Sequence, residues 1–258
     1  MNHIKNKTQN KKEGQLSGIL MILLIWILLA AYQRIALDKP FPYPWEAILA
    51  LLDPSQNMLL HAGASLLRWG SGFILASSLG IVLGIIMGLS PVVERLFSPL
   101  VTVLQLIPGL AWIPITMIVF GLGNGATIFM ITVTAIAPII INTRSGIQQI
   151  ETVLLQAAQT MELSPRRTFF RVILPGAAPS IISGLRTGAA NGFRVLISAE
   201  MVVGSSLGLG YALYQSRWTL DYQAAFGALT LIIIIGLIVE RVIFSSLDCH
   251  IRQKRGLL

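Results

Sequence analysis

The segment LLQAAQTMELSPRRTFFRVILPG, residues 154–176, is polar, whereas long apolar runs flank it on both sides. Just before and within it, apolar and small side chains recur at steps of three and four residues, the period of one helix face: Val153, Leu154, Ala157, Ala158 and Met161. Ser164 is a favourable N-cap and Pro165 a favourable first residue, so a second helix is expected to begin there. Pro175 and Gly176 are expected to end it. The segment predicts two short helices, suited either to a partner protein or to lipid headgroups.

The overall composition is that of a membrane protein. Of the 258 residues, 54% are hydrophobic and 12% are charged, whereas soluble domains carry about 25% charged residues. The single cysteine, Cys249, excludes an intrachain disulfide. With His3, His61 and His250 scattered along the chain, no metal site is predicted.

Six membrane spans are predicted, because a bilayer core needs about 20 apolar residues in a helix. The charge-free run 96–143 is long enough for two of them, with a break at GLGNG, 121–125. The others are placed at 14–33, between Arg68 and Glu94, at 178–203 and at 223–246. The first resembles a signal peptide in its lysine-rich front, but its length favours a retained span.

The distribution of lysine and arginine predicts the orientation. With the N-terminus inside, the outer segments hold only Arg34, Lys39, Arg68 and Arg217. The inner segments hold Lys5, Lys7, Lys11, Lys12, Arg95, Arg144, Arg166, Arg167, Arg171, Arg241, Arg252, Lys254 and Arg255. Both termini are therefore expected to be cytoplasmic, and this bias explains the net charge of +8 without nucleic acid.

The fifth span carries a polar stripe. At 100° per residue, six side chains fall within about 40° of Thr187: Ser180, Ser183, Asn191, Arg194, Ser198 and Ser205. The stripe either lines a pathway, with Thr187, Asn191, Arg194 and Ser198 as candidates, or packs against another polar helix. Arg194 either meets an anionic solute or pairs with a carbonyl end. Glu200 lies on the opposite side of the helix, where we expect Arg68 or Arg217 to pair with it and a charge exchange to restore assembly.

Two other spans have unusual small residues or prolines. Gly72, Ala76, Gly80, Gly84 and Gly88 repeat every four residues, which favours close helix packing over contact with a solute. In QLIPGLAWIPI, residues 105–115, Pro108 and Pro114 predict a kinked or broken helix, which serves as a structural kink, a gate or both. Glu240 and Arg241 are expected to anchor the last span at the interface.

QAAQTMELSPRRTFFRVILP, residues 156–175, resembles the coupling-loop signature of ABC importer permeases. Ala157, Ala158 and the Ile-Leu-Pro ending at 173–175 match that signature, whereas Gln156 stands for its usual glutamate and Glu162 for its glycine. Three more segments resemble the nitrate/sulfonate/taurine-type branch: SLLRWGSGFILASSLGIVLGIIMGLS (65–90), QLIPGLAWIPITMIVFGLGNGATIF (105–129) and GLRTGAANGFRVLISAEMVVGSSLGLGYAL (184–213).

The resemblance implies an all-α polytopic membrane protein with the type I ABC importer permease fold. A basic cytoplasmic segment, 1–15, would precede a transmembrane domain, 16–258, with a cytoplasmic coupling loop at about 145–177. The implied ATPase-docking residues are Gln156, Ala157, Ala158, Met161, Glu162, Ser164 and Pro165. The implied location is a bacterial-type plasma membrane.

The implied partners are two cytoplasmic ATPase subunits, an extracytoplasmic solute-binding protein and a second permease copy as a homodimer, all in membrane lipid. ATP and Mg²⁺ would be bound by the ATPase, with no cofactor in this chain. The chain has no GxxxxGK[ST] phosphate loop, so it is not expected to be an enzyme. The implied solute is a small anion of the nitrate/sulfonate/taurine type, and thiamine-precursor-like solutes also fit the branch.

Two alternatives remain. A secondary transporter would need a buried carboxylate for ion coupling, and often an inverted repeat, but 96–143 holds no charge and Glu200 is the only mid-span acid. A non-transporting scaffold that keeps the docking loop is disfavoured by the polar stripe.

Overall fold

The computed structural model describes residues 2–204 and 206–241, with side chains from Ser17 onward apart from Pro54. Ser205 of the predicted stripe and residues 242–246 of the predicted last span lie outside the described residues. So do Cys249, His250, Arg252, Lys254 and Arg255.

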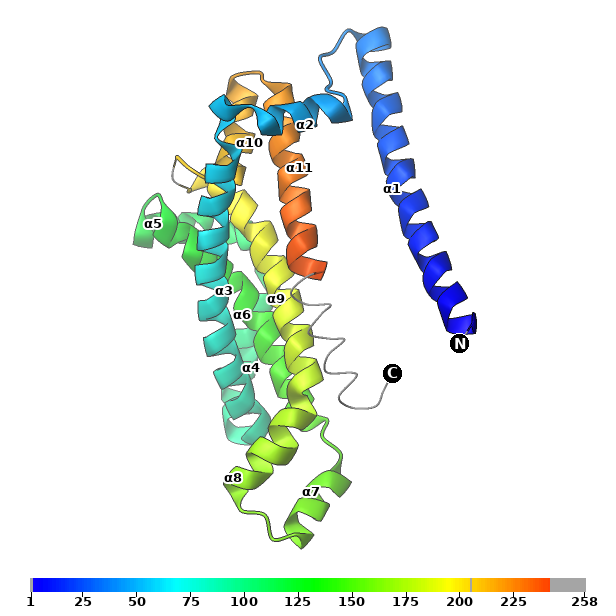
Figure 1. Ribbon diagram of the computed structural model, residues 1–258. Helices are drawn as coiled ribbons and strands as arrows, with labels where there is room; N and C mark the ends of the chain where they lie inside the picture. The colour runs from blue at the N-terminus through cyan, green and yellow to red at the C-terminus, as the bar shows by residue number, and fades with distance from the viewer. Residues whose placement is uncertain (1, 205, 242–258) are drawn as a thin grey trace. The chain divides into compact units, whose positions relative to one another are not determined.

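The described part of the chain is helical (Figure 1). Its helices are α1 (Asn2–Leu37), α2 (Pro44–Leu52), α3 (Met58–Leu89), α4 (Pro91–Leu106), α5 (Ile113–Phe120), α6 (Asn124–Gln148), α7 (Thr152–Thr160), α8 (Pro165–Thr168), α9 (Leu174–Val202), α10 (Leu209–Trp218) and α11 (Tyr222–Ile238). Short 3₁₀ turns lie at η1 (Pro54–Gln56) and η2 (Gly109–Trp112), and a π-helical turn, η3, at Phe169–Ile173.

Within the described residues, 5 helices are long and apolar enough to cross a membrane, or 6 if one bent pair counts as a span. The five are Ser17–Leu37, Met58–Leu89, Asn124–Gln148, Pro165–Val202 and Tyr222–Arg241. The bent pair is Pro91–Leu106 with Gly109–Phe120, at 103°. Five of the six predicted spans therefore have a matching helix, and the predicted third span corresponds to the bent pair, which adds a sixth only if it counts as one span.

Proline and glycine determine both breaks in the middle of the chain. Ile107 is extended, with ψ 119, as expected of a residue before proline, and α4 ends there. Pro114 breaks nothing, because it lies in the first turn of α5, where a missing N–H costs little. The expected break at 121–125 is confirmed: α5 ends at Phe120, and Gly121 and Gly123 have φ of 68 and 127, where other residues would be strained.

One prediction about α3 is wrong. Arg68 was expected outside the span, but α3 begins at Met58 and carries Arg68 inside the helix, where it is buried. The arginine is tolerated there because it meets a carboxylate and neutral acceptors, described below.

The chain divides into two compact units. The first consists of residues 1–58 and 212–231, with a small core in which Met58, Ala212, Ala224 and Ala228 are buried. Within this unit, Trp26 Nε1 donates to the Pro42 carbonyl at 3.1 Å, and Arg34 pairs with Glu46 at 2.5 Å.

Helix α2 of the first unit is amphipathic, a feature that the sequence analysis did not foresee. Ala47 is buried, whereas the other side of the helix exposes Trp45, Ile48, Leu49 and Leu52. The chain from Leu37 to Met58 thus contains a short helix with an uncovered apolar face between two candidate spans.

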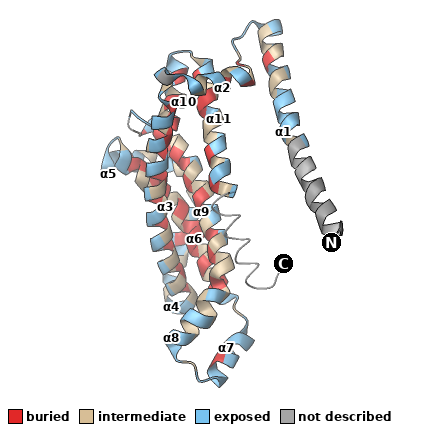
Figure 2. Cartoon of the chain, viewed as in Figure 1, coloured by how far each residue is buried: buried red, intermediate tan, exposed pale blue. Residues whose placement is uncertain are grey.

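The second unit, within the described parts of 59–211 and 232–241, is built around α6. Along α3, the small residues predicted to pack do so: added Cβ atoms at Gly72, Gly80 and Gly88 would lie 2.8–2.9 Å from side-chain atoms of Ile131, Ile139 and Ile147. Helix α9 packs against another side of α6 equally closely, because an added Cβ at Gly184 or Gly188 would lie 2.8 Å from an atom of α6. Buried residues accordingly concentrate along α6 and α9 (Figure 2).

We expect Gly84→Ala to lower the free energy of unfolding by about 1–3 kcal/mol through overpacking. A Cβ at Gly84 would lie 2.6 Å from Thr143 Cβ and 2.9 Å from the Ile140 carbonyl oxygen. The matched control is Gly70→Ala on the same helix, where nothing lies within 4 Å. The melting temperature of the purified protein in detergent should fall for Gly84→Ala alone. Equal melting temperatures for the two variants would contradict this packing.

Candidate functional site

The loop at residues 154–176 contains two helices that begin where expected, α7 and α8. Helix α7, Thr152–Thr160, ends in a Schellman motif: the N–H of Leu163 donates to the Ala158 carbonyl at 3.1 Å, and that of Glu162 to Gln159 at 2.9 Å. Glu162 has a φ of 52, in the left-handed region. The turn therefore keeps the conformation that favours glycine, and glutamate adopts it at a cost of about 1 kcal/mol.

The second helix begins at Pro165 as predicted, but the expected capping bond is not made. The Ser164 side chain accepts no hydrogen bond from the first turn, and its carbonyl oxygen instead accepts from the Thr168 N–H at 2.9 Å.

The prediction that Pro175 and Gly176 end this helix is wrong. The chain continues from α8 through the π turn η3 into α9, as one helical stretch, Pro165–Val202. The N–H of Leu174 pairs with the Phe169 carbonyl, five residues back. The backbone hydrogen bonding thus shifts from residues four apart to residues five apart just before Pro175. The N–H that Pro175 lacks falls in the first turn of α9, where its absence is tolerated.

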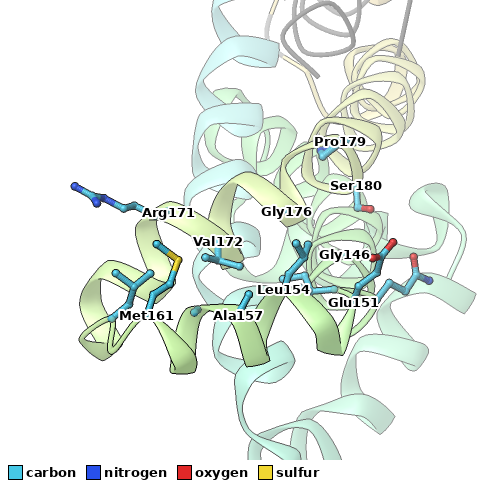
Figure 3. A pocket seen from close by; sticks show the side chains of 14 residues that line it. Gly146, Glu151, Leu154, Ala157, Met161, Arg171, Val172, Gly176, Pro179 and Ser180 are labelled. Carbon is cyan, nitrogen blue, oxygen red and sulfur yellow. The ribbon is translucent and has the colours of Figure 1, made fainter. Parts of the chain in front are cut away.

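A cleft of about 610 Å³ lies between α7 and the helix that follows it (Figure 3). It is lined by Leu154 and Ala157 of α7 and by its C-cap Met161, and from the opposite side by Val172 and Gly176. Met161 is 72% exposed and Leu154 48% exposed, so much of this apolar wall is uncovered. Arg171 also borders the cleft, but its side chain points away from it (Figure 3).

The seven predicted docking residues therefore divide into two groups. Ala157, Ala158 and Met161 line the cleft, and of these Ala158 is buried at 3% exposure. The other four are exposed and lie outside its lining: Gln156, Glu162, Ser164 and Pro165. A partner can thus contact the exposed turn and the cleft, whereas Ala158 holds α7 in place.

The polar stripe on α9 is uncovered along most of its length. Ser183, Thr187 and Arg194 are exposed, and Asn191 and Ser198 are half-buried. A neighbouring face of α9, centred about 100° around the helix from Thr187, packs against α6 through Gly184, Gly188 and Gly192. Ser180 departs from the stripe: it lines the cleft and packs against Gly146 of α6.

The groups of the stripe bond to their own helix. Thr187 Oγ1 donates to the Ser183 carbonyl at 3.0 Å, and Ser198 Oγ to that of Arg194 at 3.3 Å. Arg194 Nη2 donates to Asn191 Oδ1 at 2.7 Å. These bonds keep the polar side chains along α9 instead of joining it to a neighbouring helix.

The predicted partner of Glu200 is confirmed as Arg68. Arg68 Nη1 lies 2.6 Å from Glu200 Oε1, and both residues are buried. Arg68 also donates to Asn124 Oδ1 and to the Leu207 carbonyl, each at 2.6 Å. The Glu200 carboxylate further accepts from Ser65 Oγ at 2.8 Å and from the N–H of Gly210 at 3.0 Å.

The loop after α9 closes over this carboxylate, which the sequence analysis missed. Gly208 has a φ of 143, and a Cβ there would lie 2.5 Å from the Glu200 carboxyl carbon. The N–H of Leu209 donates to Ser65 Oγ at 2.8 Å, and that of Gly208 to His61 Nδ1 at 2.9 Å. The alternating glycines of LGLG, residues 207–210, are the signal that a backbone approaches closely here.

Glu240, predicted as an interfacial anchor, forms an ion pair with Arg186 of α9. Arg186 Nε donates to Glu240 Oε1 at 2.7 Å, and both side chains are exposed. Glu240 therefore links the end of the last span to α9.

Long apolar helices, an exposed helix-pair loop and one polar helix face define a multi-pass membrane protein of the permease class. The profile of the family described as binding-protein-dependent transport system inner membrane component matches residues 80–254. The chain belongs to this family and is the permease subunit of an ABC importer, a non-enzymatic membrane component.

Relatives lie in the expected branch. A putative ABC transporter permease of Methanocaldococcus jannaschii is 36% identical over 253 residues, 93% of each chain. The nitrate import permease protein NrtB of Synechocystis is 31% identical, covering 92% of this chain and 89% of that one. The taurine transport system permease protein TauC of Escherichia coli is 32% identical, covering 86% and 83%.

The fold is shared with a solved structure, the methionine ABC transporter MetNI in inward-facing conformations. The TM-score is 0.66 at 20% identity, and the match covers 78% of this chain and 98% of that one.

We expect Glu200→Gln to lower the free energy of unfolding by about 3–5 kcal/mol, because it leaves Arg68 buried without its counter-charge. Glu240→Gln breaks an exposed pair and should cost about 1 kcal/mol or less. Size-exclusion profiles and melting temperatures of the two variants test this.

The exchange Arg68→Glu with Glu200→Arg, which the sequence analysis expected to restore assembly, should now fail. An arginine at 200 would face Ser65 Oγ and the N–H of Gly210, which both donate. Full recovery in the exchanged variant would contradict this arrangement of donors.

Proposed function

We propose that this permease subunit forms, with a second copy of itself, the translocation pathway of an ATP-driven importer for a small anion of the nitrate, sulfonate or taurine type. Two cytoplasmic ATPase subunits bind ATP and Mg²⁺ and dock on the α7 loop. An extracytoplasmic protein delivers the solute, and both termini of this chain are cytoplasmic. The basic segment 1–15 precedes a transmembrane domain, 16–258, that contains the loop at about 145–177.

The uncovered apolar surface at α7 carries the proposal of ATPase docking. Leu154, Ala157 and Met161 form an exposed wall of the cleft, beside the exposed turn at Glu162. A short helix in an aqueous loop gains nothing from leaving such a wall open, unless a partner covers it. On this proposal, a side chain of the ATPase enters the cleft, and the surrounding surface of the ATPase contacts the turn at Glu162.

The stripe on α9 supports the assignment of the pathway. Thr187, Asn191, Arg194 and Ser198 are proposed to face the solute, because polar groups at membrane depth turn toward water-filled cavities. Relatives named for nitrate and taurine transport support an anion, since both carry a negatively charged oxygen group.

The two alternatives meet specific objections. A secondary transporter needs a carboxylate that can take up a proton or sodium ion. Glu200, the one buried acid among the described residues, is already paired with Arg68, Ser65 and Gly210. A scaffold without transport has no use for the exposed polar stripe.

We expect an ATPase subunit to co-purify with this chain from native membranes in mild detergent, and Ala157→Arg to abolish that association. The arginine would place a long charged side chain in the cleft. Gln159→Arg is the matched control, because Gln159 is exposed and lies about 200° around α7 from Ala157. Ala158 is unsuitable for this test, since it is buried.

Retention of the ATPase by Ala157→Arg would contradict docking at the cleft. Absence of any ATPase, under conditions that preserve a known importer complex, would favour the scaffold or the secondary transporter.

The complex reconstituted in liposomes with its binding protein should accumulate a small oxyanion in an ATP-dependent manner. Nitrate, bicarbonate and taurine are the first labelled probes, each against a control without ATP. Uptake of a thiamine-precursor-like solute, and of none of these three probes, would overturn the proposed solute class.

A further inference from the structure

Arg194 differs from the other arginines on the central helices α3, α6 and α9. Arg68 meets Glu200, Arg144 lies 3.5 Å from Glu94, and Arg186 meets Glu240. Among the described residues, Arg194 meets only neutral oxygens: Asn191 Oδ1 at 2.7 Å and the Ala190 carbonyl at 3.3 Å. Arg194 is therefore a positive charge on a candidate membrane helix that forms no ion pair with a carboxylate among the described residues.

The position of Arg194 makes this imbalance significant. It lies eight residues before the end of α9 at Val202, or about 12 Å along the helix axis. An arginine without a counter-charge inside a membrane span is costly, and it is found there where it has a function.

The guanidinium is exposed and held in place. The bonds from Nε and Nη2 fix the side chain against its own helix through Ala190 and Asn191. Of its five N–H donors, these bonds engage two among the described residues, so the exposed guanidinium keeps three donors for a ligand. A planar fork of donors fits two oxygens of one oxyanion, which a lysine ammonium does not.

We propose that Arg194, oriented by Asn191, is the anion-recognition site of the pathway and binds the oxyanion group of the solute. The site rests on the proposed function, because it requires the α9 stripe to line the pathway. Ser198 and Thr187, on the same face, supply hydroxyl groups on either side along the helix. The solute supplies the counter-charge that the described chain lacks.

The test measures the local electrostatic potential with charged thiol reagents. Ser198→Cys is made in a Cys249→Ser chain, assembled with its ATPase, and labelled in membranes with a negative sulfonatoethyl or a positive trimethylammonioethyl methanethiosulfonate. The ratio of the negative to the positive rate should fall about tenfold when Arg194→Gln is added, because a fixed charge concentrates counter-ions in a cleft. Nitrate should slow the negative reagent, and this protection should disappear with Arg194→Gln.

Two further variants separate charge from geometry. Arg194→Lys keeps the charge and should keep the rate ratio, but should weaken nitrate protection because the fork is lost. Arg186→Gln removes an arginine from the same helix, twelve residues from position 198, and should leave both measurements unchanged.

The outcomes distinguish the two proposals. If the thiol introduced by Ser198→Cys reacts with neither reagent, the stripe does not line a watery pathway, and the pathway assignment itself fails. If that thiol reacts with both reagents but the rate ratio is the same with Arg194→Gln, the pathway stands. The anion site is then wrong, and Arg194 is neutralised by a carboxylate of another chain.

Discussion

The close packing of α6 between two faces of small residues is the constraint on which the second unit depends. In lipid, apolar side chains gain little by leaving one apolar surface for another, so helices associate through close van der Waals contact. Gly72, Gly80, Gly84 and Gly88 bring α3 against α6, and Gly184 and Gly188 bring α9 against it. This packing fixes the rotation of α9 and so decides that its polar stripe is left uncovered.

The buried charges complete this arrangement. Arg68 and Glu200 lie on different helices, and the loop that follows α9 closes over them through backbone N–H groups. Such a pair is weak evidence for stability in itself, because removing two charges from water is costly. Its complete set of hydrogen bonds suits it to fix one arrangement of α3, α9 and the loop that follows α9.

The uninterrupted helix from Pro165 to Val202 joins the two parts of the proposed machinery. Its first turns border the cleft at α7, and its later turns carry Thr187, Asn191 and Arg194. The π turn at Phe169–Ile173 accommodates Pro175 without ending the helix. A displacement of the docking loop would therefore act directly on the helix that carries the proposed anion site.

The sequence by itself determined the class of protein, the approximate positions of most of its spans and the start of each helix in the loop. These follow from local properties: apolar length, glycine and proline breaks, and the three- and four-residue period. It also indicated that the small residues of α3 pack closely against another helix. It indicated as well that Glu200 needs a cation, since a charge inside a membrane helix is costly without a partner.

The tertiary structure decided which neighbour each group meets. It placed Ser65 and the LGLG backbone around Glu200, buried Ala158 while leaving Ala157 in the cleft, and paired Arg186 with Glu240. It also left Arg194 without a carboxylate among the described residues. Helix periodicity fixes the angle of a side chain around its own axis, but long-range contacts depend on how several helices rotate and pack together.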